Sequence, residues 1–197
     1  TEENLRRTLF PLGGLTKQEV RQIALNHGFE ALSKKAESQE ICFVPNNDYR
    51  TFLAEQGIHV PQGEYVNNQG QVLGLHQGYC HYTIGQRKGL GIALGAPKFV
   101  TKIDATNNRV TLGDREDLLS THAMIADVRI RDWDWLQESP TIQARIRYKS
   151  PAVNAKLIPN GLNESTIHFT SPVWGVTPGQ SLVMYKDNLV VGGGIIQ

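Results

Sequence analysis

Two cysteines, Cys42 and Cys80, carry the thiols through which this chain could form covalent intermediates. Cys42 stands where a polar stretch runs into a short apolar one, a pattern that predicts a loop entering a brief strand. Loop amides and two nearby lysines can stabilise a thiolate there, which can then accept a persulfide or act as a nucleophile. A cysteine between Ile41 and Phe43 can equally be a buried small hydrophobe, and we expect Cys80 only to pack.

The segment Tyr82–Ile92 combines several glycines with the adjacent cations Arg87 and Lys88. Glycine lets the backbone approach a phosphate, and the two side chains can neutralise the phosphate charge. The segment matches neither the phosphate-loop pattern nor the dinucleotide-binding pattern of glycines. We therefore expect Arg87 and Lys88 to contact an RNA backbone, and an ordinary basic turn is the alternative interpretation.

A second basic segment alternates charged residues with others. If it forms a strand, Arg145, Arg147 and Lys149 share one face, with Tyr148 beside them. Such a face can bind phosphates while the tyrosine stacks on a base. A solvated strand face is the alternative. Gln180 follows a turn rich in glycine and proline, and its amide can both donate and accept hydrogen bonds.

The elements that must position these residues begin with helices. Residues 2–9 have a helical pattern, and the pattern of residues 16–27 predicts a helix in which Thr16 and Glu19 make a capping box. A second helix is predicted for residues 48–55, with Asn46 or Asn47 as its cap.

From residue 58 the pattern changes to short β-prone runs between turn residues. Two hairpins are predicted around residues 67–70 and 107–108. Six further runs predict a small closed barrel: Ala123–Arg131, Thr141–Tyr148, Ala152–Ile158, Ser165–Phe169, Ser181–Tyr185 and Leu189–Val191. The fold class is therefore mixed α+β, with helices first, a β-rich middle and a six-stranded antiparallel β-barrel last.

Composition limits the classes of function. With 20 lysines and arginines against 19 acidic residues, the net charge of +1 creates no whole-molecule field for nucleic acid, so RNA contact must come from local patches. The six histidines lack metal-ligand spacing, and we predict no metal site. No apolar run approaches the roughly 20 residues of a membrane-spanning helix, and no signal-peptide pattern is present, so we expect a cytoplasmic protein without membrane partners.

Several segments together resemble the tRNA-specific 2-thiouridylases, the MnmA/TrmU family. They occur in the family's order along the whole chain: Leu9–Arg21, Ser38–Phe43, Tyr82–Ile92, Arg147–Tyr148, Thr177–Gln180 and Gly192–Ile196. The resemblance implies three parts. Residues 1–44 are the C-terminal tail of an α/β ATP-pyrophosphatase domain and carry the reactive cysteine, 45–120 are a middle domain, and 121–197 are a tRNA-binding β-barrel.

The resemblance also implies an activity. Family members replace the C2 oxygen of the wobble uridine of tRNA with sulfur, using ATP, with Mg²⁺ expected, to activate that oxygen. A cysteine persulfide, loaded by a sulfur-relay protein, delivers the sulfur, and a second cysteine then forms a disulfide with the first. By resemblance Cys42 bears the persulfide. Arg147, Tyr148 and Gln180 match positions that touch tRNA, and RNA contact by Arg87 and Lys88 is a hypothesis.

The chain departs from the family pattern in two respects. The Ser-Gly-Gly-Val-Asp-Ser-type ATP loop and the partner cysteine are absent, and Cys80 does not match a reactive position. Because the sequence opens at Thr1 within a helical pattern, we expect a fragment that is inactive alone while the full-length protein is a sulfurtransferase. Two alternatives remain: a stand-alone tRNA-binding module, and a cysteine hydrolase in which His27 assists Cys42.

Overall fold

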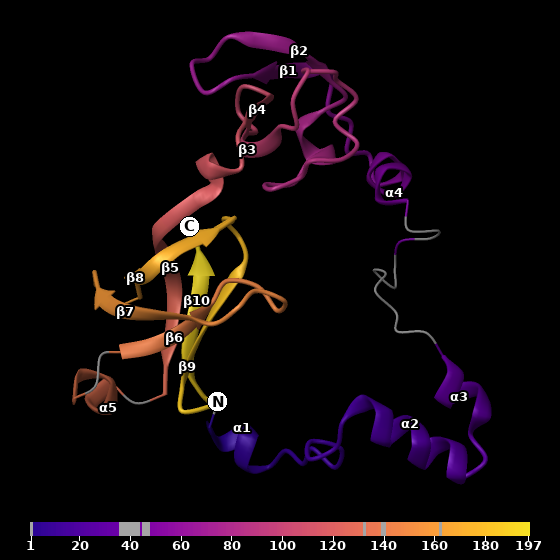
Figure 1. Ribbon diagram of the computed structural model, residues 1–197, viewed down its shortest axis with the longest axis vertical. Helices are drawn as coiled ribbons and strands as arrows, with labels where there is room; N and C mark the ends of the chain where they lie inside the picture. Colours follow the sequence, from indigo (N-terminus) through magenta and orange to yellow (C-terminus); the bar gives the residue numbers. More distant parts are fainter. Residues whose placement is uncertain (1, 36–43, 45–47, 132, 139–140, 162) are drawn as a thin grey trace. The chain divides into compact units, whose positions relative to one another are not determined.

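A computed structural model describes residues 2–35, 44, 48–131, 133–138, 141–161 and 163–197 of the chain (Figure 1). The chain divides into two compact units, Thr1–Ile58 and His59–Gln197. The first unit is helical and the second is rich in strands. The predicted fold class, with its helical start, β-rich middle and terminal barrel, is confirmed.

The described part of the first unit contains four short helices, α1 (Glu2–Arg6), α2 (Lys17–Asn26), α3 (Glu30–Lys34) and α4 (Tyr49–Glu55). The predicted capping box begins α2: the Thr16 side chain accepts from the Glu19 amide at 3.3 Å, and the Thr16 amide donates to the Glu19 carboxylate at 2.6 Å. These bonds lower the pKa of Glu19 below its ordinary value.

The cap of α4 differs from the prediction. Asp48, not Asn46 or Asn47, is the N-cap residue, and its carboxylate accepts from the Thr51 amide at 3.1 Å and from the Thr51 hydroxyl at 2.6 Å. Asp48 immediately precedes the first helical residue, so its side chain reaches the amide three positions on. The two asparagines lie outside the described residues.

The second unit begins with a four-stranded sheet in the order β2-β1-β4-β3. Both predicted hairpins form, β1 (Gly63–Val66) with β2 (Val72–His76) and β3 (Phe99–Asp104) with β4 (Arg109–Gly113), and β1 and β4 join them as parallel neighbours. The sheet buries its own apolar cluster, which includes Tyr65, Tyr82, Leu90, Val100, Val110 and Leu112. The loop between β2 and β3 passes over this cluster and carries the 3-10 turn η2 (Tyr79–His81).

After the turn η3 (Glu116–Leu118) the chain enters a closed barrel whose six strands, all antiparallel, follow the order β10-β5-β8-β7-β6-β9. The strands are β5 (Leu119–Ile130), β6 (Thr141–Arg145), β7 (Val153–Pro159), β8 (Ser165–Trp174), β9 (Ser181–Lys186) and β10 (Leu189–Ile196), with α5 (Trp133–Glu138) between β5 and β6. Alternating side chains fill the interior, as closure of a small barrel requires.

One strand is shorter than predicted. β6 ends at Arg145, and residues 147–150 form a turn in which the Ser150 amide donates to the Arg147 carbonyl at 3.1 Å. Pro151 follows and has no amide hydrogen to continue a ladder. The prediction that Arg145, Arg147 and Lys149 share one strand face is therefore wrong. Arg145 stays on the strand and lies 5.7 Å from the centre of the Tyr185 ring, while the other two belong to the turn.

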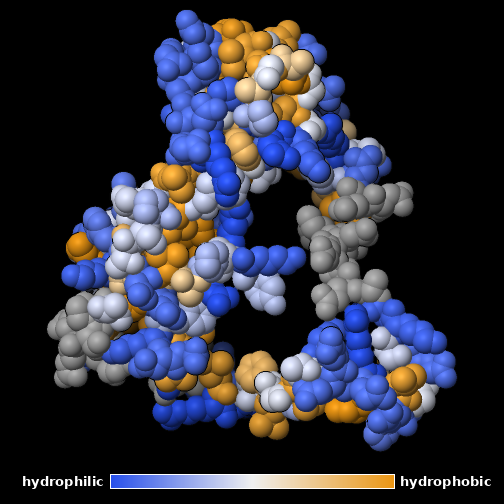
Figure 2. Space-filling view, in the orientation of Figure 1, coloured by the Kyte–Doolittle hydropathy of each residue, from blue (hydrophilic) through white to orange (hydrophobic). Residues whose placement is uncertain are grey.

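The surface of the sheet and barrel mixes hydrophobic and hydrophilic residues (Figure 2). On the face drawn in Figure 2, hydrophobic patches alternate with hydrophilic ones over the barrel and the sheet. Because the net charge is only +1, a polyanion would have to be met by local groups of cations rather than by the field of the whole molecule.

Candidate functional site

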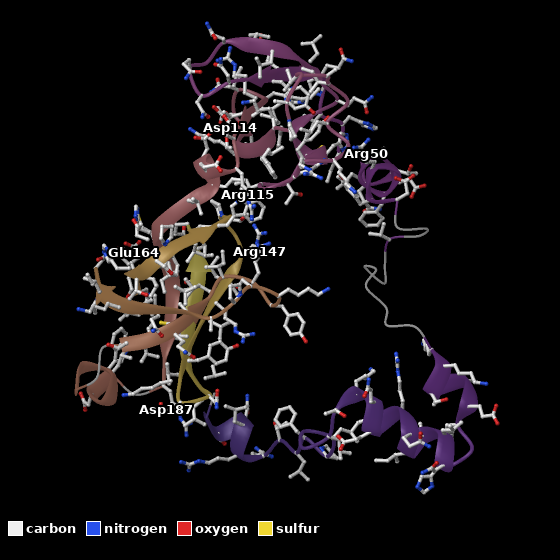
Figure 3. The ribbon with its side chains drawn as sticks, viewed as in Figure 1. Arg50, Asp114, Arg115, Arg147, Glu164 and Asp187 are labelled. Carbon is white, nitrogen blue, oxygen red and sulfur yellow. The ribbon has the colours of Figure 1, made fainter. Side chains whose placement is uncertain are left out.

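Arg147 lies at one end of the barrel (Figure 3), where a set of neutral acceptors holds its side chain. Its Nε donates to Gln180 Oε1 at 3.0 Å, and its Nη2 donates to the Gly175 carbonyl at 2.7 Å and to Thr177 Oγ1 at 2.6 Å. The sequence separates Arg147 from these partners by 28 to 33 positions, and barrel closure brings them together. Two of the predicted tRNA-binding residues, Arg147 and Gln180, are thus in direct contact.

The acceptors are themselves fixed by the backbone. The Gly179 amide donates to the Ile196 carbonyl at 2.8 Å, and the Ile196 amide donates to the Gln180 carbonyl at 2.9 Å, so the turn before β9 is fastened to the end of β10. Thr177 is buried and donates its hydroxyl proton to the Gly175 carbonyl at 2.9 Å. The guanidinium therefore binds to acceptors that are already in place, and little side-chain entropy is lost for each hydrogen bond it forms.

The charge of Arg147 has no counterion within the described part of the chain, because all of its side-chain partners there are neutral. The described contacts also leave Nη1 without an acceptor, and Arg147 is only half-buried. A guanidinium whose position is fixed and whose charge is uncompensated is suited to a phosphate or another oxyanion.

Tyr148 stands beside this cation with its ring almost wholly in solvent, 91% exposed. Its turn is fixed from behind, because the Arg147 amide donates to Ser150 Oγ at 3.2 Å and Ser150 Oγ donates to the Arg147 carbonyl at 2.8 Å. An aromatic ring displayed on a fixed turn beside a free positive charge can stack on a nucleobase while the charge binds the backbone.

Arg87 and Lys88 occupy an exposed turn in the loop between β2 and β3. Gln86 fixes this turn: its Oε1 accepts from the Thr83 amide at 3.0 Å, and its Nε2 donates to the Lys88 carbonyl at 2.9 Å. The backbone of Gln86 also pairs with β3, since its carbonyl accepts from the Val100 amide at 2.9 Å. Sequence reasoning missed this role of Gln86, which a glutamine beside two cations does not reveal.

A buried group of three rings lies under the same loop. The centre of the His76 ring lies 5.1 Å from that of Tyr65 and 5.3 Å from that of Tyr82, and the Tyr65 hydroxyl donates to the Leu90 carbonyl at 2.7 Å. His76 is 2% exposed and its Nδ1 accepts from the Gly78 amide at 3.0 Å. Burial lowers the pKa of His76, because desolvation disfavours the charged imidazolium.

A hollow of about 480 Å³ follows the loop from Arg87 to Lys98. Apolar residues such as Leu90, Ile92 and Pro97 line much of it. Lys98 is ion-paired with Asp114 at 2.8 Å, so Arg87 is the lining cation that remains available to an anion.

The cysteines give no further support to a catalytic centre. Cys42 lies outside the described residues, so its surroundings and its relation to His27 stay predictions. Cys80 is half-buried, with its sulfur 3.8 Å from His81 Nδ1. Within the described ranges, no three His, Cys, Asp or Glu side chains gather as metal ligands, and no helix combines the length and apolar character needed to cross a membrane.

Comparison with protein families matches three consecutive parts of the chain. Residues 1–46 match the tRNA methyl transferase HUP domain, residues 50–114 match the tRNA methyl transferase PRC-barrel domain, and residues 125–196 match the aminomethyltransferase beta-barrel domain. The last two ranges contain Arg87, Lys88, Arg147, Tyr148 and Gln180.

Curated relatives are similar over the whole chain. A tRNA-specific 2-thiouridylase from Natranaerobius thermophilus is 45% identical over 100% of this chain and 53% of its own length. Proteins of the same name from Halothermothrix orenii and Acetivibrio thermocellus are 47% and 44% identical, again over 100% of this chain and 55% of their own lengths. The chain spans about half the length of the curated relatives it matches.

Proposed function

The chain belongs to the tRNA-specific 2-thiouridylase family, and from this membership we propose that it holds tRNA while sulfur replaces the C2 oxygen of the wobble uridine. The observation that carries the proposal is the Arg147 guanidinium, which is fixed by Gln180 and Thr177 without a counterion among the described residues, next to the exposed ring of Tyr148. Arg87 and Lys88 form a second cationic group of the proposed tRNA surface.

In this proposal Cys42 carries the sulfur as a persulfide, supplied by a sulfur-relay protein. Support comes from the segment Ser38–Phe43, which resembles the persulfide-bearing segment of the family. The names of the three matched domains mention methyl or aminomethyl transfer, whereas the relatives' names state 2-thiouridylation. We follow the relatives because a cysteine in this segment suits sulfur transfer.

ATP, Mg²⁺, a disulfide that closes the catalytic cycle and a cytoplasmic location also belong to the proposal. Among the described residues no three His, Cys, Asp or Glu side chains gather as metal ligands, and the sequence contains no phosphate-loop pattern, so we assign no nucleotide site to them. We therefore assign no step through ATP to this chain. Its own contribution is to bind and orient tRNA and to carry sulfur.

Binding of unmodified tRNA tests the first part of the proposal. We expect the affinity to fall steeply with KCl concentration, because each phosphate contact releases counterions. Arg147→Gln should weaken binding. The control, Arg129→Gln, removes the same charge from an exposed residue of β5 and should have little effect. Arg129 lies ten positions after Leu119, the first residue of that strand, which separates these two residues by about 33 Å. Equal effects of the two variants would contradict the assignment of the site.

Mass spectrometry tests the second part. After incubation with a persulfide donor, we expect one added sulfur atom on Cys42 in the wild type and in Cys80→Ser, and none in Cys42→Ser. We also expect the full-length protein to thiolate tRNA and Cys42→Ser to abolish this thiolation. Salt-dependent tRNA binding with no sulfur on Cys42 would instead indicate a stand-alone tRNA-binding module.

A further inference from the structure

Trp174 lies where the four-stranded sheet meets the barrel. It is the last residue of β8, and it pairs with Leu119, the first residue of β5. The adjoining Gly175 amide donates to the Leu118 carbonyl at 2.8 Å, which fastens the end of β8 to the turn that leads out of the sheet. The indole is therefore placed to contact both parts of this unit.

On the barrel side the ring faces Arg147. The guanidinium carbon lies 5.9 Å from the ring centre, within the range of a cation–π interaction. Gly175, directly after Trp174, supplies the carbonyl that binds Arg147 Nη2. A Cβ on Gly175 would lie 3.1 Å from that same nitrogen, so a glycine at this position lets the guanidinium approach.

On the sheet side the ring contacts the loop that carries Arg87 and Lys88. Phe99, the first residue of β3, meets it edge to face with ring centres 6.2 Å apart. Gly85 has a positive φ of 86°, and a Cβ there would fall 2.8 Å from Cη2 of the indole. The Gly85 amide donates to the Val100 carbonyl at 2.8 Å, so the backbone under the ring is part of the sheet edge.

Hydrogen bonding does not explain why a tryptophan occupies position 174. Its indole Nε1 is buried and has no partner in the part of the chain that the structure describes. A buried donor without an acceptor lowers stability, so the ring is favoured by what its faces and edge touch.

We propose that Trp174 is a positioning residue that holds Arg147 of the barrel and the Arg87–Lys88 turn of the sheet as one tRNA-binding surface. The inference rests on the proposed function and adds a requirement: the two cationic groups are coupled through the indole. Rigid coupling lets the second phosphate contact form at high effective concentration once the first has formed. Without the ring, the turn no longer has a fixed position relative to Arg147, and its contribution to binding falls.

The test measures the effect of Arg87→Gln on tRNA affinity in two backgrounds. With Trp174 present, we expect Arg87→Gln to weaken binding by about 5-fold, as loss of one phosphate contact does. In Trp174→Ala we expect the same substitution to weaken binding by less than about 2-fold, because the contact is already compromised. The fold-change caused by Arg87→Gln is measured within each background, so any loss of folded protein caused by the Trp174 substitution cancels. If the indole served only the overall stability of the unit, this fold-change would be the same with and without Trp174.

Trp174→Leu guards against poor folding of the alanine variant. Leucine keeps apolar volume and removes the unpaired indole donor, and we expect it to abolish the Arg87 effect in the same way. An Arg87 effect of equal size in all three backgrounds would overturn the coupling while leaving the proposed function intact. If the wild type shows no salt-dependent tRNA binding, the proposed function itself fails, and the inference fails with it.

Discussion

Replacement of Arg147 by lysine and by glutamine separates two roles of this side chain. The guanidinium donates to Gln180, Gly175 and Thr177 over 2.6 to 3.0 Å and keeps Nη1 for an incoming anion. Glutamine removes the charge. Lysine keeps the charge, but a single ammonium on a flexible stem cannot reproduce the fork that meets these acceptors and a phosphate together.

The two substitutions should differ in salt dependence. For Arg147→Gln we expect tRNA affinity to fall about 10-fold, or about 1.4 kcal/mol, which is the scale of one lost charge-assisted hydrogen bond at a half-exposed site. The slope of log K against log salt should become shallower by about one unit, since one phosphate contact is lost. For Arg147→Lys we expect a loss of about 5-fold with the slope unchanged, because the charge remains and only its placement is impaired.

Filter binding of unmodified tRNA between about 50 and 200 mM KCl resolves both quantities. Arg129→Gln is the matched control, with the same charge change at an exposed position near the opposite end of β5. An unchanged slope in Arg147→Gln would show that Arg147 meets no phosphate. Wild-type affinity in Arg147→Lys would show that the hydrogen-bonded placement of the guanidinium is irrelevant.

Three further outcomes follow from the structure and the sequence. Burial lowers the pKa of His76 from its ordinary value of 6.5, so below about pH 6.5 the unfolded chain binds a proton that the folded chain excludes. The free energy of unfolding, measured by urea titration, should therefore fall as the pH decreases. The fall should be smaller in His76→Gln. Tyr65→Phe removes the donor to the Leu90 carbonyl and should lower the free energy of unfolding by about 1–2 kcal/mol. A urea midpoint equal to that of the wild type would show that this hydrogen bond does not stabilise the fold. The chain alone, given ATP, Mg²⁺ and a persulfide donor, should not thiolate tRNA, and a chromatographic signal for 2-thiouridine would refute this expectation.

The barrel could be predicted from the sequence because its strands show regular alternation and are separated by clear turn residues. The capping box of Thr16 and Glu19 and both hairpins of the sheet were predictable for the same reason: each depends on residues close in sequence. The end of β6 was not, since a pattern of alternating cations continues past Arg145 although Pro151 cannot pair and Ser150 closes a turn.

The arrangement of the site depends on contacts that no local pattern encodes. Arg147 and Gln180 meet only because β6 and β9 become neighbours in the closed barrel. Trp174 fits core packing as well as any other role when seen in the sequence, and its contacts with Gly85 and Phe99 appear only once the sheet and barrel are both formed. The resemblance to a family indicated individual residues, and the structure adds that Arg147, Tyr148 and Gln180 stand on turns fixed by hydrogen bonds.

Site-specific crosslinking tests the central claim most directly. Tyr148 is 91% exposed, so a photoreactive phenylalanine analogue can replace it without disturbing the core. Leu189, which is 56% exposed, provides the control at the turn beside Asp187, and Figure 3 shows Asp187 and Arg147 at opposite ends of the barrel. We predict that irradiation with unmodified tRNA gives a crosslink from position 148 that excess unlabelled tRNA suppresses, and none from position 189. A crosslink from position 189 alone, or equal crosslinks from both, would contradict the assignment of this barrel end as the tRNA surface.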